Sequence, residues 1–413
     1  MKTTCTLLIA TLFTTFLFAQ TETCDCKKDL DFLVKKMKKM PSYKEQVKNQ
    51  KEDAFNALYT ELASNMEKNL PIETCYMLLS QQMSFVKDYH AYVKLNEGFV
   101  KKDIVETKEG IENFKNSTRF KEHPRAQEPI AQLKEVLSQK PAPSIEGIYQ
   151  QGDEYVLGIH KNKNANTYDG IVLESNHPLW EAGQIKFTAT KNAQGNYDLY
   201  YYDSDTYRPY YANNMQFENM RIWSFKKEAS KSNFEFIKND TINWGYETLQ
   251  GGTHYIRMKT FSGSTSNRKA QREFFSEMEN KLTAGNLILD LRSNGGGSYE
   301  VSDPFLKLFQ QKGIKVFVIT NQFTGSNAEQ FTVKLRELEG TVQVGQTTRG
   351  VVAYGRDKEA PSSPSGYFTF YTTDMNFHDP FFAYEGIGVV PSIKLEYKSD
   401  WIDQTLELIN QTK

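Results

Sequence analysis

Asn286 to Gly297 reads NLILDLRSNGGG, and the chain after it repeats one pattern of strand, turn and helix. The apolar run Leu287–Leu289 is typical of a buried strand, and three consecutive glycines end it. Three glycines allow a sharp turn whose backbone N–H groups face a ligand. Further strands are expected over Lys315–Asn321 and Thr341–Gly345, with a helical pattern before each of them.

This order predicts parallel strands whose turns meet at the carboxyl edge of one sheet, where open α/β sheets bind ligands. The second strand leads into the turn TGSNAE, Thr324 to Glu329. Gly297 and Ser326 are therefore expected to share one crevice. A serine at such a turn, close to the N–H groups that begin a helix, has a workable geometry for a nucleophile beside an oxyanion hole.

Ser326 also has a purely structural interpretation. A serine followed three residues later by a glutamate, here Glu329, is a capping-box signature, so Ser326 could serve only to begin a helix. The glycine-rich turn one strand earlier favours the catalytic interpretation.

Composition sets the class of protein. The 413 residues carry a formal net charge of −1 and are 39% hydrophobic, which is ordinary for a globular chain of two or three domains. A near-neutral chain gives no support for a nucleic-acid partner or a polybasic membrane contact.

The first 20 residues predict export. Lys2 precedes an apolar run from Leu7 to Phe18, with Ala19 near the end, which is typical of a secretory signal and too short to span a bilayer. Cleavage is expected after Gln20, and no later window predicts a transmembrane segment. The mature protein is therefore expected in the periplasm or outside the cell.

Export would leave three cysteines, Cys24, Cys26 and Cys75. In an oxidising compartment one pair could form a disulfide, but the sequence leaves open whether any pair does so. This spacing is not a metal signature, and no metal or organic cofactor is expected.

The remaining chain predicts three regions. Residues 21–142 show helical periodicity, although Ala91–Leu95 alternates like a short strand. Residues 143–240 carry short aromatic-rich strands between Gly and Asn turns, which predicts a small antiparallel β-domain. Residues 241–413 hold the α/β core, with a further strand over Tyr367–Thr373 and a closing helix over Trp401–Ile409.

A serine nucleophile needs a base, and six histidines are available. Residue context leaves three of them nearly equal. His90 follows a helical stretch, His254 begins a core strand, and His378 lies in a loop close to Glu385.

The runs DLRSNGGG, TGSNAE and GQTTRG resemble, in order and spacing, the core of the tail-specific (C-terminal-processing) serine peptidases, family S41. The resemblance extends from Asn286 to about Pro391. In one branch of that family a lysine base follows the third turn, but Val351 stands there in this chain. The chain is more similar to the branch with the tricorn core protease and the retinoid-binding repeats, which takes a histidine from an earlier segment and a late glutamate.

This resemblance implies a crotonase-like α/β core with an inserted β-domain, and it identifies the base. The run VKDYHAY, Val86 to Tyr92, is similar to the segment that supplies the branch's histidine, and EGIGVVP is similar to its late glutamate turn. Ser326 is then the nucleophile, His90 the general base and Glu385 the acid that orients the imidazole. Tyr89 replaces the serine that precedes the histidine in that branch.

The oxyanion donors implied are the backbone N–H groups of Gly297 and Asn327. The expected function is peptide hydrolysis through an acyl-enzyme, with a polypeptide substrate. Two alternatives remain: a catalytically silent peptide- or ligand-binding protein on the same fold, and a crotonase-like hydrolase that is not a peptidase. The sequence does not give the oligomeric state.

Overall fold

The computed structural model describes residues 23–66, 69–162, 166–228, 230, 233–238 and 240–411. The expected leader, residues 1–20, and its cleavage point at Gln20 lie outside the described residues. Among the described residues, no helix has both the length and the apolar character needed to cross a bilayer.

The core is a six-stranded sheet in the order β13-β14-β15-β16-β17-β21, in which only the β13–β14 pair is antiparallel. Its strands are β13 (Trp244–Thr248), β14 (His254–Met258), β15 (Gly285–Asp290), β16 (Ile314–Thr320), β17 (Val342–Gly345) and β21 (Ile393–Lys394). Parallel neighbours require crossover connections, and helices supply them.

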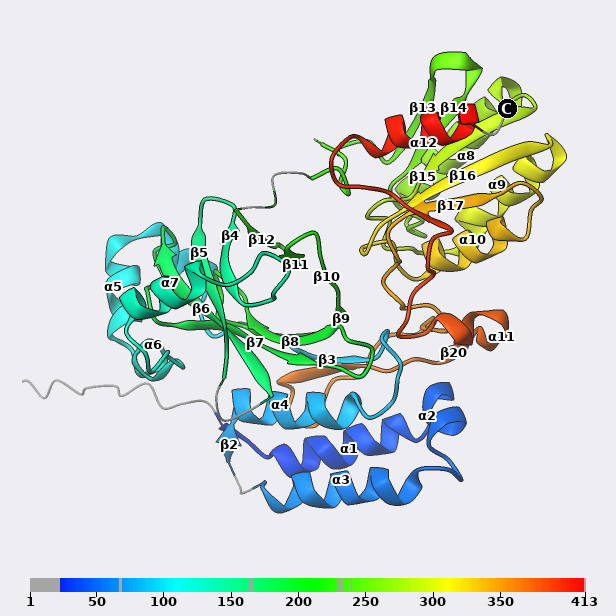
Figure 1. Ribbon diagram of the computed structural model, residues 1–413. Helices are drawn as coiled ribbons and strands as arrows, with labels where there is room; N and C mark the ends of the chain where they lie inside the picture. The colour runs from blue at the N-terminus through cyan, green and yellow to red at the C-terminus, as the bar shows by residue number, and fades with distance from the viewer. Residues whose placement is uncertain are drawn as a thin grey trace, which may run out of the picture.

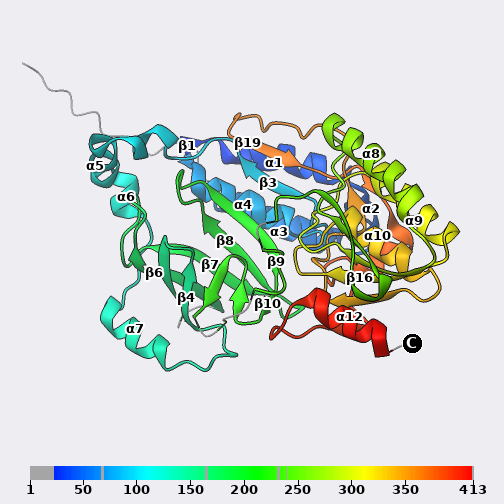
Figure 2. The same cartoon turned by 90° about the horizontal axis from the view of Figure 1, so that it is seen from above.

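Both faces of this sheet are covered by helices. On one face lie α8 (Thr265–Lys281), α9 (Tyr299–Gln311) and α10 (Asn327–Arg336), and on the other lies α12 (Trp401–Gln411) (Figure 2). Side chains alternate along each strand, so Leu287 and Leu289 pack with the first group while Ile288 packs with Trp401. Apart from the strand over Tyr367–Thr373, the strands and the closing helix expected in this core are present.

The antiparallel region is a nine-stranded sheet in the order β10-β11-β12-β4-β5-β6-β7-β8-β9. The strands are β4 (Gly147–Gln151), β5 (Tyr155–Lys161), β6 (Thr167–Ser175), β7 (Ile185–Lys191), β8 (Tyr197–Tyr202), β9 (Pro209–Met215), β10 (Phe217–Glu218), β11 (Arg221–Ile222) and β12 (Phe225–Lys227). Its aromatic residues form an extensive buried cluster that includes Tyr149, Phe187 and Tyr207. Packing therefore explains much of the aromatic content of this region.

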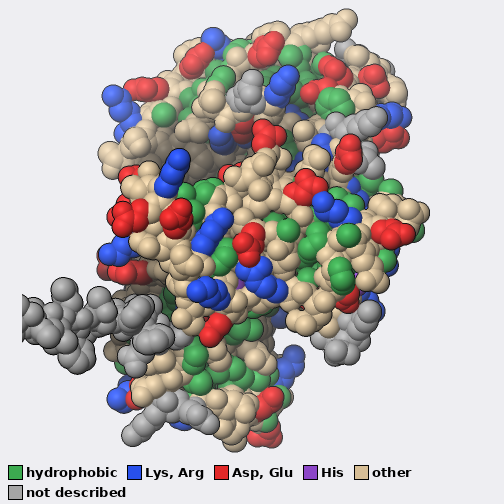
Figure 3. All heavy atoms as spheres, turned by 90° about the vertical axis from the view of Figure 1, so that its left-hand side faces the viewer, with side chains coloured by type: hydrophobic (Ala, Val, Ile, Leu, Met, Phe, Trp, Pro, Cys, Tyr) green, Lys and Arg blue, Asp and Glu red, His purple; other side chains and the backbone are tan. Residues whose placement is uncertain are grey.

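Helices α5 (Lys108–Asn116), α6 (Thr118–Glu122) and α7 (Ile130–Ser138) pack against this sheet. Figure 3 shows one face of the molecule, seen from the side that is on the left in Figure 1. Lys and Arg side chains are interspersed there with Asp and Glu side chains, so neither sign of charge dominates that face.

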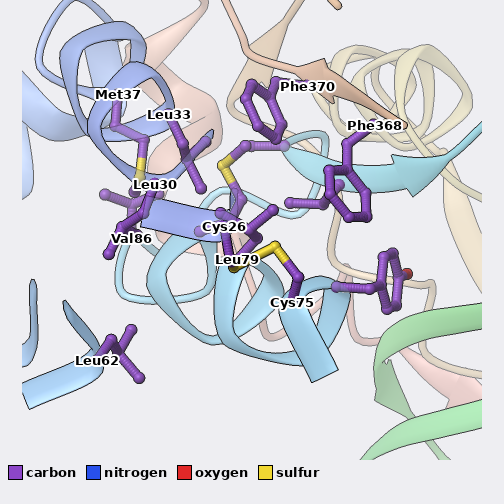
Figure 4. Packing of buried hydrophobic residues seen from close by; sticks show 14 of the residues in the cluster. Cys26, Leu30, Leu33, Met37, Leu62, Cys75, Leu79, Val86, Phe368 and Phe370 are labelled. Carbon is purple, nitrogen blue, oxygen red and sulfur yellow. A yellow bond between two sulfur atoms is a disulfide. The ribbon is translucent and has the colours of Figure 1, made fainter. Parts of the chain in front are cut away.

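The N-terminal region is a helical layer of α1 (Cys26–Met37), α2 (Pro41–Gln46), α3 (Glu52–Ser64) and α4 (Ile72–Met83), at the bottom of Figure 1. A disulfide joins Cys26 to Cys75, while Cys24 is a buried free thiol. Leu30, Leu33 and Leu79 pack around the disulfide (Figure 4). The cystine thus holds α1 against α4 inside a continuous apolar core.

One strand pairing links this layer to the C-terminal part of the chain. β3 (Tyr92–Leu95) pairs with β19 (Phe368–Tyr371), and both contribute to the core around the disulfide. The strand expected over Tyr367–Thr373 therefore forms, but it pairs with the N-terminal layer and not with the core sheet. This pairing fixes the loop that precedes β3, which carries His90.

Candidate active site

Ser326 lies at the N-cap of α10, directly after the loop that follows β16. Its backbone has φ 56° and ψ −129°, a conformation that non-glycine residues rarely adopt. The Ser326 N–H donates to the carboxylate of Glu329 at 3.0 Å, so the capping-box glutamate is present. Ser326 is thus both the helix-capping residue and a strained residue, and the two sequence interpretations describe the same turn.

Two glycine-containing turns meet at Ser326. The Gly325 N–H donates to the Asn294 carbonyl at 2.9 Å, which joins the turn after β16 to the turn after β15. A Cβ added to Gly296 would lie 2.7 Å from the backbone nitrogen of Asn327 and 2.7 Å from Cβ of Ser326. Only glycine allows this approach, which explains why the sequence has a glycine run here.

Gly297 is held from the other side. A Cβ on it would lie 2.0 Å from the Phe261 carbonyl oxygen, and its φ is 141°. The N–H groups of Gly297 and Asn327 form no hydrogen bond with other described residues. Both remain available to a substrate oxygen, as an oxyanion hole requires, and their role remains a prediction.

His90 reaches Ser326 from a segment 236 residues earlier in the chain. Its Nε2 lies 2.9 Å from Ser326 Oγ. Burial lowers the pKa of His90 to about 4, and the charges of Arg349 and Arg356 lower it further in the same direction. The imidazole is therefore neutral at pH 7 and able to accept the serine proton.

Glu385 accepts hydrogen bonds from backbone N–H groups, one of which belongs to the residue before His90. One carboxylate oxygen accepts the Tyr89 N–H at 3.1 Å, and the other accepts the N–H groups of Val352 and Ala353 at 2.6 and 2.7 Å. His90 Nδ1 is buried and has no hydrogen-bond partner among the described residues. Glu385 thus joins the residue before His90 to the 352–353 segment, and its expected role in orienting the imidazole remains a prediction.

A second buried carboxyl group lies in the same segment. Asp88 accepts the Thr373 hydroxyl at 2.5 Å, which ties the loop before His90 to the chain just after β19. Burial raises the pKa of Asp88 to about 6. Burial likewise raises the pKa of Glu385 to about 8; its backbone hydrogen bonds oppose that rise, and the nearby Asp88 charge adds to it.

Of the other two candidate bases, only His254 has a described side chain. His254 bonds to the hydroxyl of Tyr246 at 3.0 Å and contacts Thr283, as a packed strand histidine does. His378 begins the short helix α11 (His378–Phe381), and its side chain is not among the described ones. Of the two whose side chains the structure describes, His90 is the histidine that lies within hydrogen-bond distance of Ser326.

Two residues at the site were not identified from the sequence. Glu329 was interpreted only as a cap, yet it also accepts the N–H groups of Gly350 and Val351, at 2.6 and 2.9 Å, and the Thr348 hydroxyl at 2.5 Å. Arg349, in the same turn, packs against the Thr324–Gly325 segment that precedes Ser326. The sequence could have indicated both residues, because each has a polar side chain in a turn at the carboxyl edge of the sheet. The groups that each one contacts depend on the fold.

The chemistry that this arrangement supports is acyl transfer. A serine hydroxyl, a neutral imidazole and two free N–H groups converge at one place, without a cluster of metal ligands there. Among the described residues, the one cluster with metal-ligand geometry is Cys24, Asp29 and Cys75, and it includes a disulfide sulfur.

Comparison with known proteins gives one family match. Residues 252–316 match the model described as peptidase family S41. No curated protein matches the chain.

Solved structures that are similar to the chain include three peptidases. A putative peptidase from Parabacteroides merdae is 12% identical, with 93% of this chain and 96% of that chain covered and a TM-score of 0.42. The photosystem II D1 C-terminal processing protease is 11% identical, with coverages of 93% and 97% and a TM-score of 0.40. The tricorn protease is 13% identical, with coverages of 94% and 37% and a TM-score of 0.42.

Proposed function

Since the chain belongs to peptidase family S41 through its residues 252–316 and is a serine-type peptidase, we propose that Ser326 is its nucleophile and His90 its general base. The observation that carries the proposal is the 2.9 Å contact between His90 Nε2 and Ser326 Oγ. Two groups so far apart in sequence come within hydrogen-bond distance only through the fold, and at a turn with two free N–H groups.

In this mechanism Ser326 Oγ attacks the peptide carbonyl carbon while its proton moves to His90 Nε2. The N–H groups of Gly297 and Asn327 stabilise the negative oxygen of the tetrahedral intermediate. His90 then gives the proton to the leaving amine, and the acyl-enzyme forms. A water molecule, deprotonated by the same imidazole, hydrolyses the ester and regenerates the serine.

The imidazole accepts a proton at Nε2 only when its own proton is on Nδ1. Nδ1 is buried without a partner among the described residues, so orientation of the ring depends on the backbone around it. Glu385 and Asp88 hold that backbone through Tyr89 and Thr373. Both carboxyl groups are therefore proposed as positioning residues.

The test is labelling by a fluorophosphonate probe, which reacts only with an activated serine. Wild-type protein is expected to be labelled, and Ser326→Ala to fold normally without being labelled. Ser264→Ala, which removes the hydroxyl that caps α8, is a matched control for loss of a helix-capping serine. Wild-type labelling of Ser326→Ala would refute the assignment.

We also propose that the protein is exported. Supporting observations are the signal-like residues 1–20 and the Cys26–Cys75 disulfide, which is the kind of bond that persists in oxidising compartments. N-terminal sequencing of the exported protein is expected to begin near Thr21, and Met1 as its first residue would contradict the proposal.

A further inference from the structure

Arg349 lies against the turn that carries the nucleophile. Its backbone N–H donates to the Thr324 carbonyl at 2.9 Å. A Cβ added to Gly325, the residue before Ser326, would lie 3.7 Å from Arg349 Cδ. The Arg349 side chain therefore passes next to the residue that precedes Ser326. Its positive charge lowers the pKa of His90.

The backbone of Arg349 is held firmly. Asn214, at the end of β9, donates its side-chain amide to the Arg349 carbonyl at 3.0 Å. Gln216 does the same to the Thr348 carbonyl at 2.8 Å. The antiparallel domain thus fixes the place from which this side chain extends.

The guanidinium itself has no hydrogen bond or ion pair to a described residue, although Arg349 is partly buried. Burial lowers the pKa of Arg349, as expected for a desolvated cation. An arginine does not escape this cost by losing its proton, since its pKa is far above neutral. A partly desolvated cation of this kind is stabilised when an anion pairs with it.

The charge of Glu329 acts on Arg349 and opposes the effect of burial on its pKa, but the Glu329 carboxylate forms no hydrogen bond with the guanidinium. Glu329 accepts two hydrogen bonds on each oxygen: Thr348 and Gly350 donate to one, and Val351 and Ser326 to the other. Its acceptor positions are therefore already used in holding the two turns together. The guanidinium therefore keeps its donors available for a hydrogen-bonding anion from outside the chain.

We propose that Arg349 binds a carboxylate of the substrate beside the scissile bond, so that the peptidase prefers peptides with a carboxylate at that position. This inference rests on the proposed function, because it assigns the substrate class of the same site. Arginine suits the role because its planar fork donates two parallel hydrogen bonds to a carboxylate. The carboxylate could be an acidic side chain or the end of the peptide.

Binding of the carboxylate would also affect the base. Arg349 and Arg356 now disfavour a proton on His90. A carboxylate paired with Arg349 would offset one of these charges, and the imidazolium formed during acylation would become less unfavourable. Aspartate or glutamate at the preferred position would thus improve turnover as well as binding.

The experiment uses randomised peptide libraries, in a form with a free C-terminus and a form with an amidated C-terminus, and identifies cleavage products by mass spectrometry. Wild-type protein is expected to favour Asp or Glu over Asn or Gln about tenfold or more at one position flanking the cut. If the preference is instead for a free terminus at a fixed distance, the carboxylate is the peptide end. Absence of both preferences would overturn the inference.

Variants identify the residue. Arg349→Met is expected to lose the preference, and Arg349→Lys to keep part of it. Arg356→Met is the matched control, because Arg356 is exposed and its guanidinium lies over the Tyr371 ring at 4.3 Å; it is expected to keep the preference. A preference that persists in folded Arg349→Met would also overturn the inference.

A binding arm separates this inference from the proposed function. Calorimetry with Ser326→Ala compares a glutamate peptide with its glutamine analogue and needs no turnover. If the probe labels wild type, but neither the cleavage libraries nor calorimetry show a preference for a carboxylate, the role of Arg349 is refuted and that of Ser326 is kept. If the probe does not label wild type, but Ser326→Ala binds the glutamate peptide about tenfold more tightly than the glutamine analogue, the role of Ser326 is refuted and that of Arg349 is kept.

Discussion

Replacing Glu385 by glutamine replaces one acceptor oxygen of the carboxyl group, next to the His90 segment, with a donor NH2 group. The carboxylate accepts three N–H groups, two on one oxygen and one on the other. The amide of glutamine keeps most of these bonds when its oxygen faces Val352 and Ala353. Its NH2 group then faces the Tyr89 N–H, so two donors oppose each other.

The cost follows from that single lost bond. A buried N–H left without an acceptor costs about 1–3 kcal/mol, and this one belongs to the residue before His90. Relief of the donor clash would move the His90 segment, and a shift of ~1 Å at a reacting group costs ~100-fold in rate. We therefore expect Glu385→Gln to reduce the acylation rate by about 10- to 100-fold. Loss of the base itself should cost ~10⁴-fold or more.

The assay is the acylation rate against an activated ester, measured for wild type, Glu385→Gln and His90→Ala after thermal melts show that each is folded. Glu359→Gln makes the same chemical change at an exposed site and is expected to match wild type. If folded Glu385→Gln is as inactive as His90→Ala, the carboxylate acts on the imidazole itself and not only on the backbone. Wild-type activity in Glu385→Gln would show that the hydrogen bonds of Glu385 do not position the base.

Four further predictions concern the base and the fold. His90→Ala should lose nearly all acylation while His254→Ala keeps most of it, which the same ester assay decides. The ester acylation rate should fall at low pH with a midpoint near 4, because the pKa of His90 is lowered to about 4, and Arg349→Met should move that midpoint upward. The unfolded chain, with a histidine pKa of 6.5, takes up this proton first, so the stability that neutral His90 contributes is complete above pH 6.5 and is lost as pH falls towards 4. Urea unfolding should show this loss, of roughly 3 kcal/mol, in wild type and not in His90→Ala. Replacing Cys26 and Cys75 together by alanine should lower the free energy of unfolding by about 2–4 kcal/mol in the same measurement, because their bond closes a long loop.

The sequence by itself determined the core sheet and the turn that carries Ser326. Leu287–Leu289 and the glycines after it define a strand and a turn through local preferences, and the repetition of that unit defines parallel neighbours. The positions of Ser326 and of the Gly297 and Asn327 N–H groups follow because they are part of those same turns. The local sequence pattern is sufficient to predict which residues meet when one short crossover connection joins their strands.

Only the tertiary structure decided how His90 reaches Ser326 and what Glu385 contacts. His90 depends on the pairing of β3 with β19, and residue preferences in either strand do not specify the other as partner. Glu385 bonds the Tyr89 N–H 296 residues away, where any residue but proline could supply the donor. The structure also shows that the Glu329 carboxylate already accepts four hydrogen bonds, and the inference about Arg349 depends on this observation. These contacts join segments that are far apart in the chain, so packing specifies them and local sequence does not.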